Sequence, residues 1–244
     1  MMKVNAVIVS AGKGRRFMSG KKKQFLPLAG KPVLAHTLDA FERCPLVNTV
    51  VLVVGQDDLG FCLKEIVEKY GYRKVSRVVP GGEKRQDSVK HGMDAVPEDV
   101  EIVVIHDGVR PFVTQEMIEG SIRSAMRFKA VVLGTPVKDT IKTVNPEGKI
   151  LKTLDRSSLW QIQTPQAFHA GLLRDALTKA TEDGFTGTDD ASLVERLGVE
   201  VHVLPGDSTN IKITTPEDLL LATLLLQAKY PSAKEKQIRQ GDDE

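Results

Sequence analysis

A segment rich in glycine and basic residues near the amino terminus carries the groups best suited to bind an anion. It runs Ser10-Ala11-Gly12-Lys13-Gly14-Arg15-Arg16-Phe17 and continues to Lys21-Lys22-Lys23. Glycine lets the backbone come close to a ligand, and exposed amide hydrogens then point at phosphate oxygens. Cations packed this closely repel one another, and a polyanion would relieve that repulsion. The segment therefore predicts a site for a polyphosphate such as a nucleoside triphosphate, with a solvated basic turn as the alternative.

The segment fits neither of two familiar phosphate-binding loops. A dinucleotide fingerprint requires glycine or alanine where this chain has Phe17. A P-loop requires four residues between its glycines, then lysine and a hydroxyl residue, but five residues separate Gly14 from Gly20 and Lys22 takes the hydroxyl position. The failed fingerprint argues against a nicotinamide-dependent oxidoreductase.

The elements that must position this segment indicate an α/β fold. Apolar, β-rich runs alternate with helical patterns through the first two-thirds of the chain, which predicts a mainly parallel sheet. We expect strands at 4–10, 49–54, 76–79, 101–105, 131–137 and 200–204, and helices at 32–43, 59–70, 84–95, 114–126, 170–181, 190–197 and 216–228. Ligands of such sheets collect at the carboxyl ends of the strands. Asp107, which follows a buried strand, should therefore lie near the basic segment.

Residues 140–155 break the alternation and predict a β-hairpin. Short β-like runs flank Asn145-Pro146-Glu147-Gly148, which is a turn signal. An isolated hairpin is marginal in water, so this one should pack on its own core or on another subunit. We expect one domain over 1–230 with a hairpin arm at about 138–159, then a charged, frayed tail over 231–244.

Composition argues against several classes of protein. The chain has 244 residues and a formal net charge of +2, so it lacks the broad positive field of a nucleic-acid or membrane-surface binder. Cys44 and Cys62 provide neither a disulfide framework nor a zinc-site spacing. The amino terminus lacks a signal-peptide pattern, and no run approaches the ~20 apolar residues that span a bilayer. We expect a cytoplasmic protein with no nucleic-acid or membrane partner.

Six segments, in order along the chain, resemble the signature of nucleotidylyltransferases that act on sugar phosphates. They are Ala11–Arg16 with Lys23-Gln24-Phe25, then residues 81–89, 106–112, 164–168, 188–192 and 210–214. Together they are similar to 2-C-methyl-D-erythritol 4-phosphate cytidylyltransferases from about residue 5 to residue 225. The resemblance implies a Rossmann-like three-layer sandwich, a homodimer joined through hairpin arms, and Mg²⁺-dependent use of CTP with a polyol phosphate.

The resemblance also implies roles for the matching residues on the nucleotide side. Arg16, Lys23 and Lys212 correspond to the catalytic cations around the phosphates. The residues that would surround the nucleotide are Ala11, Gly12, Gly14, Gly81, Gly82, Glu83 and Ser88. Asp107 falls at the metal-binding position. Thr209 stands where some members carry aspartate, which leaves a second carboxylate on the metal open.

Four residues correspond to the acceptor side of the family's site. Arg110 and Thr164 resemble residues that line it, while Arg156 and Thr188 resemble residues that hold the acceptor's phosphate. Arg156 would come from the partner subunit's arm. Trp160, beside the arm, is expected to be covered by packing beneath it.

The reaction that the resemblance implies, transfer of CMP from CTP to an acceptor phosphate with release of pyrophosphate, needs fixed cations more than a general base. A phosphate monoester is largely a dianion at pH 7 because its second pKa is near 6. Cations around the developing charge supply most of the stabilisation in such transfers. We therefore expect His106 to be a packed histidine at a strand end. A ribitol 5-phosphate cytidylyltransferase and a non-catalytic nucleotide-binding module remain the alternatives.

Overall fold

The computed structural model describes residues 2–12 and 22–229. Gly14 and Arg16 lie outside the described residues, as does the tail expected over 231–244. No helix within the two described ranges is long and apolar enough to cross a membrane.

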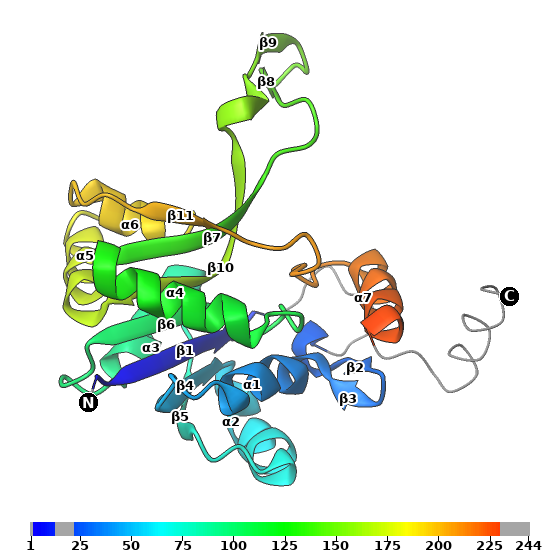
Figure 1. Ribbon diagram of the computed structural model, residues 1–244, viewed down its shortest axis with the longest axis vertical. Helices are drawn as coiled ribbons and strands as arrows, with labels where there is room; N and C mark the ends of the chain where they lie inside the picture. Colours follow the sequence, from blue (N-terminus) through cyan, green and yellow to red (C-terminus); the bar gives the residue numbers. More distant parts are fainter. Residues whose placement is uncertain (1, 13–21, 230–244) are drawn as a thin grey trace, which may run out of the picture.

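A seven-stranded sheet forms the centre of the fold (Figure 1). Its strand order is β11 (His202–Pro205), β7 (Ala130–Pro136), β10 (Trp160–His169), β6 (Ile102–Asp107), β1 (Val4–Ser10), β4 (Thr49–Val54) and β5 (Val75–Pro80). All neighbours are parallel except β10, which is antiparallel to both β6 and β7. The predicted mainly parallel sheet is confirmed.

Strand β10 is the strand of the central sheet that sequence patterning did not predict. It contains Pro165, and proline within a run normally argues against a central strand because it lacks the amide hydrogen. In the structure the pairing of β10 with β7 shifts between Gln163 and Gln166, so Pro165 falls at this irregularity. The proline thus interrupts the ladder locally without ending the strand.

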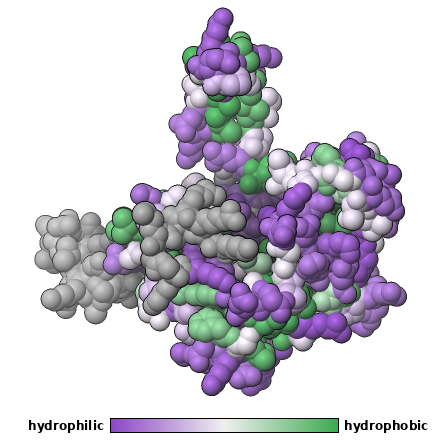
Figure 2. All heavy atoms as spheres, turned by 180° about the vertical axis from the view of Figure 1, so that it is seen from behind, coloured by the Kyte–Doolittle hydropathy of each residue, from purple (hydrophilic) through white to green (hydrophobic). Residues whose placement is uncertain are grey.

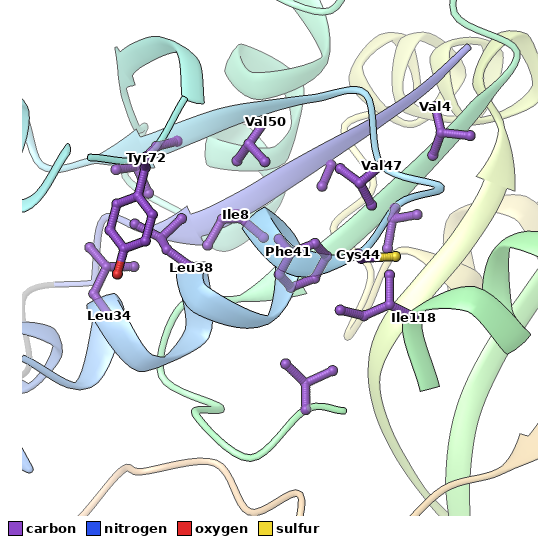
Figure 3. Close-up of a cluster of buried hydrophobic side chains, with 14 of the residues drawn as sticks. Val4, Ile8, Leu34, Leu38, Phe41, Cys44, Val47, Val50, Tyr72 and Ile118 are labelled. Carbon is purple, nitrogen blue, oxygen red and sulfur yellow. The ribbon is translucent and has the colours of Figure 1, made fainter. Parts of the chain in front are cut away.

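Helices cover both faces of the sheet, which confirms the three-layer sandwich. One face carries α1 (Val33–Arg43), α2 (Leu59–Phe61) with its π-helical continuation Cys62–Glu68, and α4 (Gln115–Phe128). The other carries α3 (Arg85–Asp94), α5 (Ala170–Glu182) and α6 (Ala191–Arg196). Alternate residues of β1 point to opposite faces: Ile8 packs with Phe41 of α1 (Figure 3), while Val7 packs with the α3 side.

The predicted hairpin is present and projects from the body between β7 and β10 (Figure 1). Its strands are β8 (Lys142–Val144) and β9 (Ile150–Thr153). At the turn, Gly148 adopts a φ of 81°, which glycine tolerates without strain, and the Asn145 Oδ1 atom accepts a hydrogen bond from the Lys149 amide at 2.8 Å. We call residues 138–159 the arm. The expectation for Trp160 was wrong, because 39% of this residue is exposed at the arm's base.

Helix α7 (Pro216–Lys229) packs beside the carboxyl end of the sheet and helps to fix the segment before it. Ala222 of α7 lies in a small apolar cluster with Val109 and Ile213. The Ile213 amide donates to the Val109 carbonyl at 2.9 Å. Residue 212 is therefore held close to the strand end at Asp107. A short pair, β2 (Pro27–Leu28) and β3 (Lys31–Pro32), lies before α1.

Candidate active site

A pocket lies at the carboxyl ends of β1 and β6, where an open α/β sheet is expected to bind its ligand. Its lining includes Ser10, Ala11, Gly12, Lys23, Gln24, Gly82, Glu83, Lys84, Arg85, Ser88, Asp107 and Lys212. Most of the residues assigned to the nucleotide side from the sequence are therefore brought together. The lining residues come from five separate parts of the chain, at 9–12, 23–24, 82–88, 107–109 and 212.

Both described ends of the glycine-rich segment are anchored. The buried Gln24 side chain donates from Nε2 to the Ser10 carbonyl at 2.9 Å and to the Gly12 carbonyl at 3.4 Å. Lys22 forms an ion pair with Asp58, with 2.6 Å between Nζ and Oδ2. These contacts fix where the segment leaves β1 and where it returns, and they leave Lys23 on the wall of the pocket.

The end of β5 approaches the start of this segment so closely that only glycine fits. A Cβ atom at Gly81 would lie 2.3 Å from that of Ala11, and one at Gly82 would lie 2.3 Å from that of Asp87. The Gly82 amide donates to the Ser88 hydroxyl at 3.1 Å. These contacts give a narrow wall of backbone, which suits close contact with a flat base or a sugar.

Asp107 is the electrostatic centre of the pocket. Its carboxylate lies 2.9 Å from the Lys212 Nζ atom, 3.2 Å from the Arg85 Nε atom and 3.5 Å from the Arg110 Nε atom. Burial by itself would raise the pKa of this carboxyl, but Arg85, Lys212 and Arg110 outweigh burial and hold the pKa well below its usual range. Asp107 is therefore ionised, and the cluster around it retains positive charge for an anionic ligand.

His106 and Thr164 support Asp107 from inside the sheet. The Thr164 hydroxyl accepts from the Asp107 amide at 3.1 Å and lies 3.0 Å from the His106 Nδ1 atom. Burial lowers the pKa of His106 to about 3, so the ring is neutral, and it packs against Phe41 with 5.2 Å between ring centroids. The prediction of a packed, strand-end histidine is confirmed. Thr164 is buried behind the pocket, and its role toward an acceptor stays a prediction.

A second pocket adjoins the first and shares Lys212 with it. Its lining includes Arg110, Thr135, Lys138, Gln163 and Asn210. The Arg110 Nη1 atom donates to the Asn210 carbonyl at 2.7 Å, which holds the guanidinium between Asp107 and this second pocket. An anionic acceptor placed here would lie next to the phosphate end of a nucleotide in the first pocket.

Besides the buried Thr164, two more of the four acceptor residues line neither pocket within one chain. Arg156 is exposed in the arm, where its Nη1 atom donates to the Lys138 carbonyl at 2.7 Å. Thr188 is exposed on the loop before α6 and lines neither pocket. Lys138 lines the second pocket, so Arg156 lies one residue away from its wall, and the predicted role of Arg156 from a partner's arm stays a prediction.

The carboxylates of the pocket suit a metal ion that binds together with the phosphates of a nucleotide. Within residues 2–12 and 22–229 no three histidine, cysteine, aspartate or glutamate side chains cluster closely enough to hold a metal ion. The described wall of the first pocket carries two carboxylates, those of Asp107 and Glu83. Mg²⁺ binds through one or two carboxylates together with substrate phosphates and water. Asp107 therefore fits such an ion, provided that the nucleotide supplies most of the ligands.

Two charged residues of the site had no role in the sequence interpretation. Arg85 lies in the segment 81–89 that carries the resemblance, and its Nη2 atom is 2.8 Å from the Asp190 Oδ2 atom. Asp190 is buried, and its backbone amide donates to the Gln166 Oε1 atom at 3.2 Å. No local pattern distinguishes Arg85 from a solvated residue at the first turn of a helix, so the one signal for this pair was that both residues lie in segments of the resemblance, 81–89 and 188–192.

Comparisons with known proteins identify the family of the chain. The family model described as 2-C-methyl-D-erythritol 4-phosphate cytidylyltransferase matches residues 4–228. The protein of that name from Syntrophus aciditrophicus is 48% identical over 225 residues, which cover 92% of this chain and 96% of the relative. That from Caldanaerobacter subterraneus is 46% identical over 226 residues, covering 93% of this chain and 100% of the relative.

Comparison with solved structures identifies the same family. The crystal structure of 4-diphosphocytidyl-2C-methyl-D-erythritol synthase from Anaerococcus prevotii superposes with a TM-score of 0.82 at 34% identity, covering 93% of this chain and 96% of that one. The cytidylyltransferase from Thermus thermophilus gives a TM-score of 0.76 at 31% identity, covering 93% and 100%. The chain therefore belongs to the 2-C-methyl-D-erythritol 4-phosphate cytidylyltransferase family.

Proposed function

We propose that this chain transfers CMP from CTP to 2-C-methyl-D-erythritol 4-phosphate, forming 4-diphosphocytidyl-2-C-methyl-D-erythritol and pyrophosphate in the non-mevalonate isoprenoid pathway. The observation that carries the proposal is the convergence of Lys23, Lys212 and Asp107 on one pocket at the carboxyl ends of β1 and β6, in a chain of this family. We expect the reaction to take place in the cytoplasm.

The reaction is an in-line displacement at the α-phosphorus of CTP. An oxygen of the acceptor's phosphate forms the new bond to that phosphorus, and the bond to the bridging oxygen of pyrophosphate breaks. The acceptor phosphate is already deprotonated near pH 7, so no general base is needed. The site agrees with this, because His106 is buried and neutral and Asp107 is occupied by cations.

The residues of the pocket would act mainly through fixed charge. Ala11 and Gly12 would present backbone to the triphosphate, and Lys23 would stabilise charge on the departing pyrophosphate. Lys212, on the opposite wall, would contact the α-phosphate. Gly14 and Arg16 would complete this set, and their assignment stays a prediction. Gly81, Gly82, Glu83 and Ser88 would hold the cytosine and the ribose.

A divalent cation, which we take to be Mg²⁺, would be held by Asp107 and the phosphates. Such an ion shields the negative charges that must approach one another during the transfer. Asp107 meets this role only if the cations on its carboxylate rearrange when the nucleotide binds, because both of its oxygens are engaged.

The acceptor would lie in the second pocket, between Arg110 and the arm of a partner subunit. A homodimer would bring Arg156 to the acceptor's phosphate, which Thr188 would contact from the other side. The arm supports this arrangement because its large apolar side chains are unusually exposed: Val144 by 57%, Ile150 by 55% and Leu151 by 63%. Figure 2 shows the apolar patches along the projecting arm.

Pyrophosphate release from CTP and Mg²⁺ tests the proposal directly. We expect release with 2-C-methyl-D-erythritol 4-phosphate and little with ribitol 5-phosphate in a parallel assay. Release mainly with ribitol 5-phosphate would keep the mechanism and change the acceptor. Binding of CTP without release in either assay would leave a nucleotide-binding module.

A further inference from the structure

The two oxygens of the Asp107 carboxylate are held by different partners. The Oδ1 atom accepts from the Arg85 Nε atom at 3.2 Å. The Oδ2 atom faces Lys212 at 2.9 Å and Arg110 at 3.5 Å. The carboxylate is thus fixed on one side by α3 and on the other by residues near the second pocket.

The three cations differ in how firmly the rest of the chain holds them. Arg85 is tied to Asp190, and Arg110 is tied to the Asn210 carbonyl. For Lys212, Asp107 is the one ion-pair or hydrogen-bond partner within the described part of the chain. Its side chain is also the most exposed of the three, at 38% against 28% for Arg85 and 11% for Arg110. Lys212 is therefore the cation that an incoming phosphate can draw away.

Asp190 lines neither pocket itself, yet it is a buried carboxylate. It is 1% exposed, it precedes α6 and it is absent from the walls of both pockets. Burial raises the pKa of Asp190, because an uncompensated buried charge is costly, and a positively charged partner opposes that rise. That partner is Arg85, at 2.8 Å. The Arg85–Asp190 ion pair either only holds α3 against α6, or it also orients the Arg85 side chain toward Asp107.

We infer that Arg85, held in place by Asp190, is a positioning residue that keeps the Asp107 carboxylate oriented after Lys212 has left it for the nucleotide's phosphates. In the nucleotide-free site Asp107 has partners on both oxygens. When Lys212 turns to phosphate, Oδ2 loses its shorter contact and keeps the longer one with Arg110, and the bond from Arg85 to Oδ1 keeps the carboxylate from rotating. The inference rests on the proposed function and assigns Asp190 a part in the reaction without any contact to substrate.

Two substitutions test this inference at residues to which no phosphate contact has been assigned. Asp190→Asn removes the charge behind Arg85, and Arg85→Gln removes the bridge itself. We expect each to lower kcat by about 10- to 100-fold, as loss of an orienting residue behind a ligand typically does, while the Kd for CTP from calorimetry changes by no more than about threefold. Because Asp190 acts through Arg85, the double variant should be no slower than Arg85→Gln alone.

Arg174→Gln provides the matched control. Arg174 also links α3 to α5, through hydrogen bonds to the Met93 and Val96 carbonyls, but it lies away from Asp107. We expect it to lower the melting temperature with kcat unchanged. If Arg85→Gln does not fold, Arg85→Lys replaces it, since lysine keeps the charge but cannot bridge two carboxylates as a rigid fork.

Three results would overturn the inference. The first is a normal kcat in Asp190→Asn alongside a slow Arg85→Gln, which would mean that Arg85 acts on substrate by itself. The second is a fall in melting temperature with normal kcat in both variants, as in the control, which would mean a purely structural pair. The third is a double variant about as slow as the product of the two single effects. Failure of the wild-type chain to release pyrophosphate would instead reject the proposed function, so the two failures are distinguishable.

Discussion

The pocket and the arm differ in how far a single chain completes them. In the pocket, Asp107 meets three cations that come from α3, the loop after β6 and the segment before α7, all of one chain. In the arm, Val144, Ile150 and Leu151 remain more than half exposed. Fully burying one such side chain contributes about 1.5–3 kcal/mol. The arm therefore still exposes apolar surface that association with another chain could bury. The charged groups around Asp107, by contrast, already have their partners within one chain.

This difference separates two parts of the proposed reaction. Nucleotide binding depends on groups that one chain already brings together. Binding of the acceptor's phosphate would depend on Arg156, which lies in the arm and lines neither pocket of its own chain. Changes in the pocket should therefore act in any assembly state, and changes in the arm should act only through a partner.

The largest effect is expected in the pocket. Lys23→Ala should lower kcat by about 10²–10³-fold, because a fixed donor that stabilises transition-state charge is lost. The melting temperature should stay close to that of the wild type. Steady-state pyrophosphate release at saturating CTP measures the effect, with Lys90→Ala on the exposed side of α3 as control. A near-normal kcat in Lys23→Ala would remove this residue from the mechanism.

A change in the arm should be smaller and should depend on the partner. Arg156→Ala removes a charge-assisted hydrogen bond worth about 1.5–3 kcal/mol, so kcat/KM for the acceptor should fall by about 10- to 150-fold with CTP binding unchanged. Mixing this variant with Lys23→Ala gives heterodimers in which one site has both native residues. Activity above the sum of the separate variants is therefore expected after subunit exchange. Additive activity would show that Arg156 serves its own chain or no site.

Association through the arm can be tested separately. Ile150→Asp combined with Leu151→Asp places charges on its exposed apolar surface. We expect the wild type to sediment as a dimer and the variant as a monomer that still binds CTP. A dimer that survives both substitutions would place the interface elsewhere.

His106, on the buried side of the pocket, should make the stability of the fold depend on pH. The pKa of His106 is lowered by burial to about 3 in the folded chain and is near 6.5 when unfolded. Between these values the unfolded state binds a proton that the folded state does not, so acidification destabilises the fold by up to about 1.4 kcal/mol per pH unit. The free energy of unfolding of His106→Gln should therefore fall less steeply from pH 6.5 to 4.5. Equal slopes would contradict a buried, neutral histidine.

The last prediction concerns the reactivity of thiols, which should differ between the core and the arm. Cys44 and Cys62 are fully buried, and burial raises the pKa of both thiols, that of Cys62 to about 12. The native chain should therefore react negligibly with a thiol reagent over the time in which Lys149→Cys, at the exposed tip of the arm, is fully modified. Rapid labelling of the wild type would mean that the layer beneath α1 opens readily.

The sequence by itself determined the features that depend on local pattern. Strand and helix periodicity predicted the mainly parallel sheet, and Asn145 to Gly148 predicted the turn of the arm. The glycines and cations around residues 10–23 predicted the phosphate side of the pocket, and Asp107 was expected at a strand end. The sheet, the turn and the place of Asp107 were predicted correctly because backbone conformation and side-chain alternation are set by neighbouring residues, while phosphate binding by residues 10–23 stays a prediction.

Only the tertiary structure decided which distant groups meet. Strand β10 enters antiparallel between β6 and β7 despite Pro165, because a shift in register accommodates the proline. Arg85 pairs with Asp190 across 105 positions of sequence, and Lys212 turns onto Asp107 because Ile213 is bonded to the loop after β6. Whether a charged side chain gains a partner depends on how whole helices and strands pack together. The local sequence around either residue does not specify that packing.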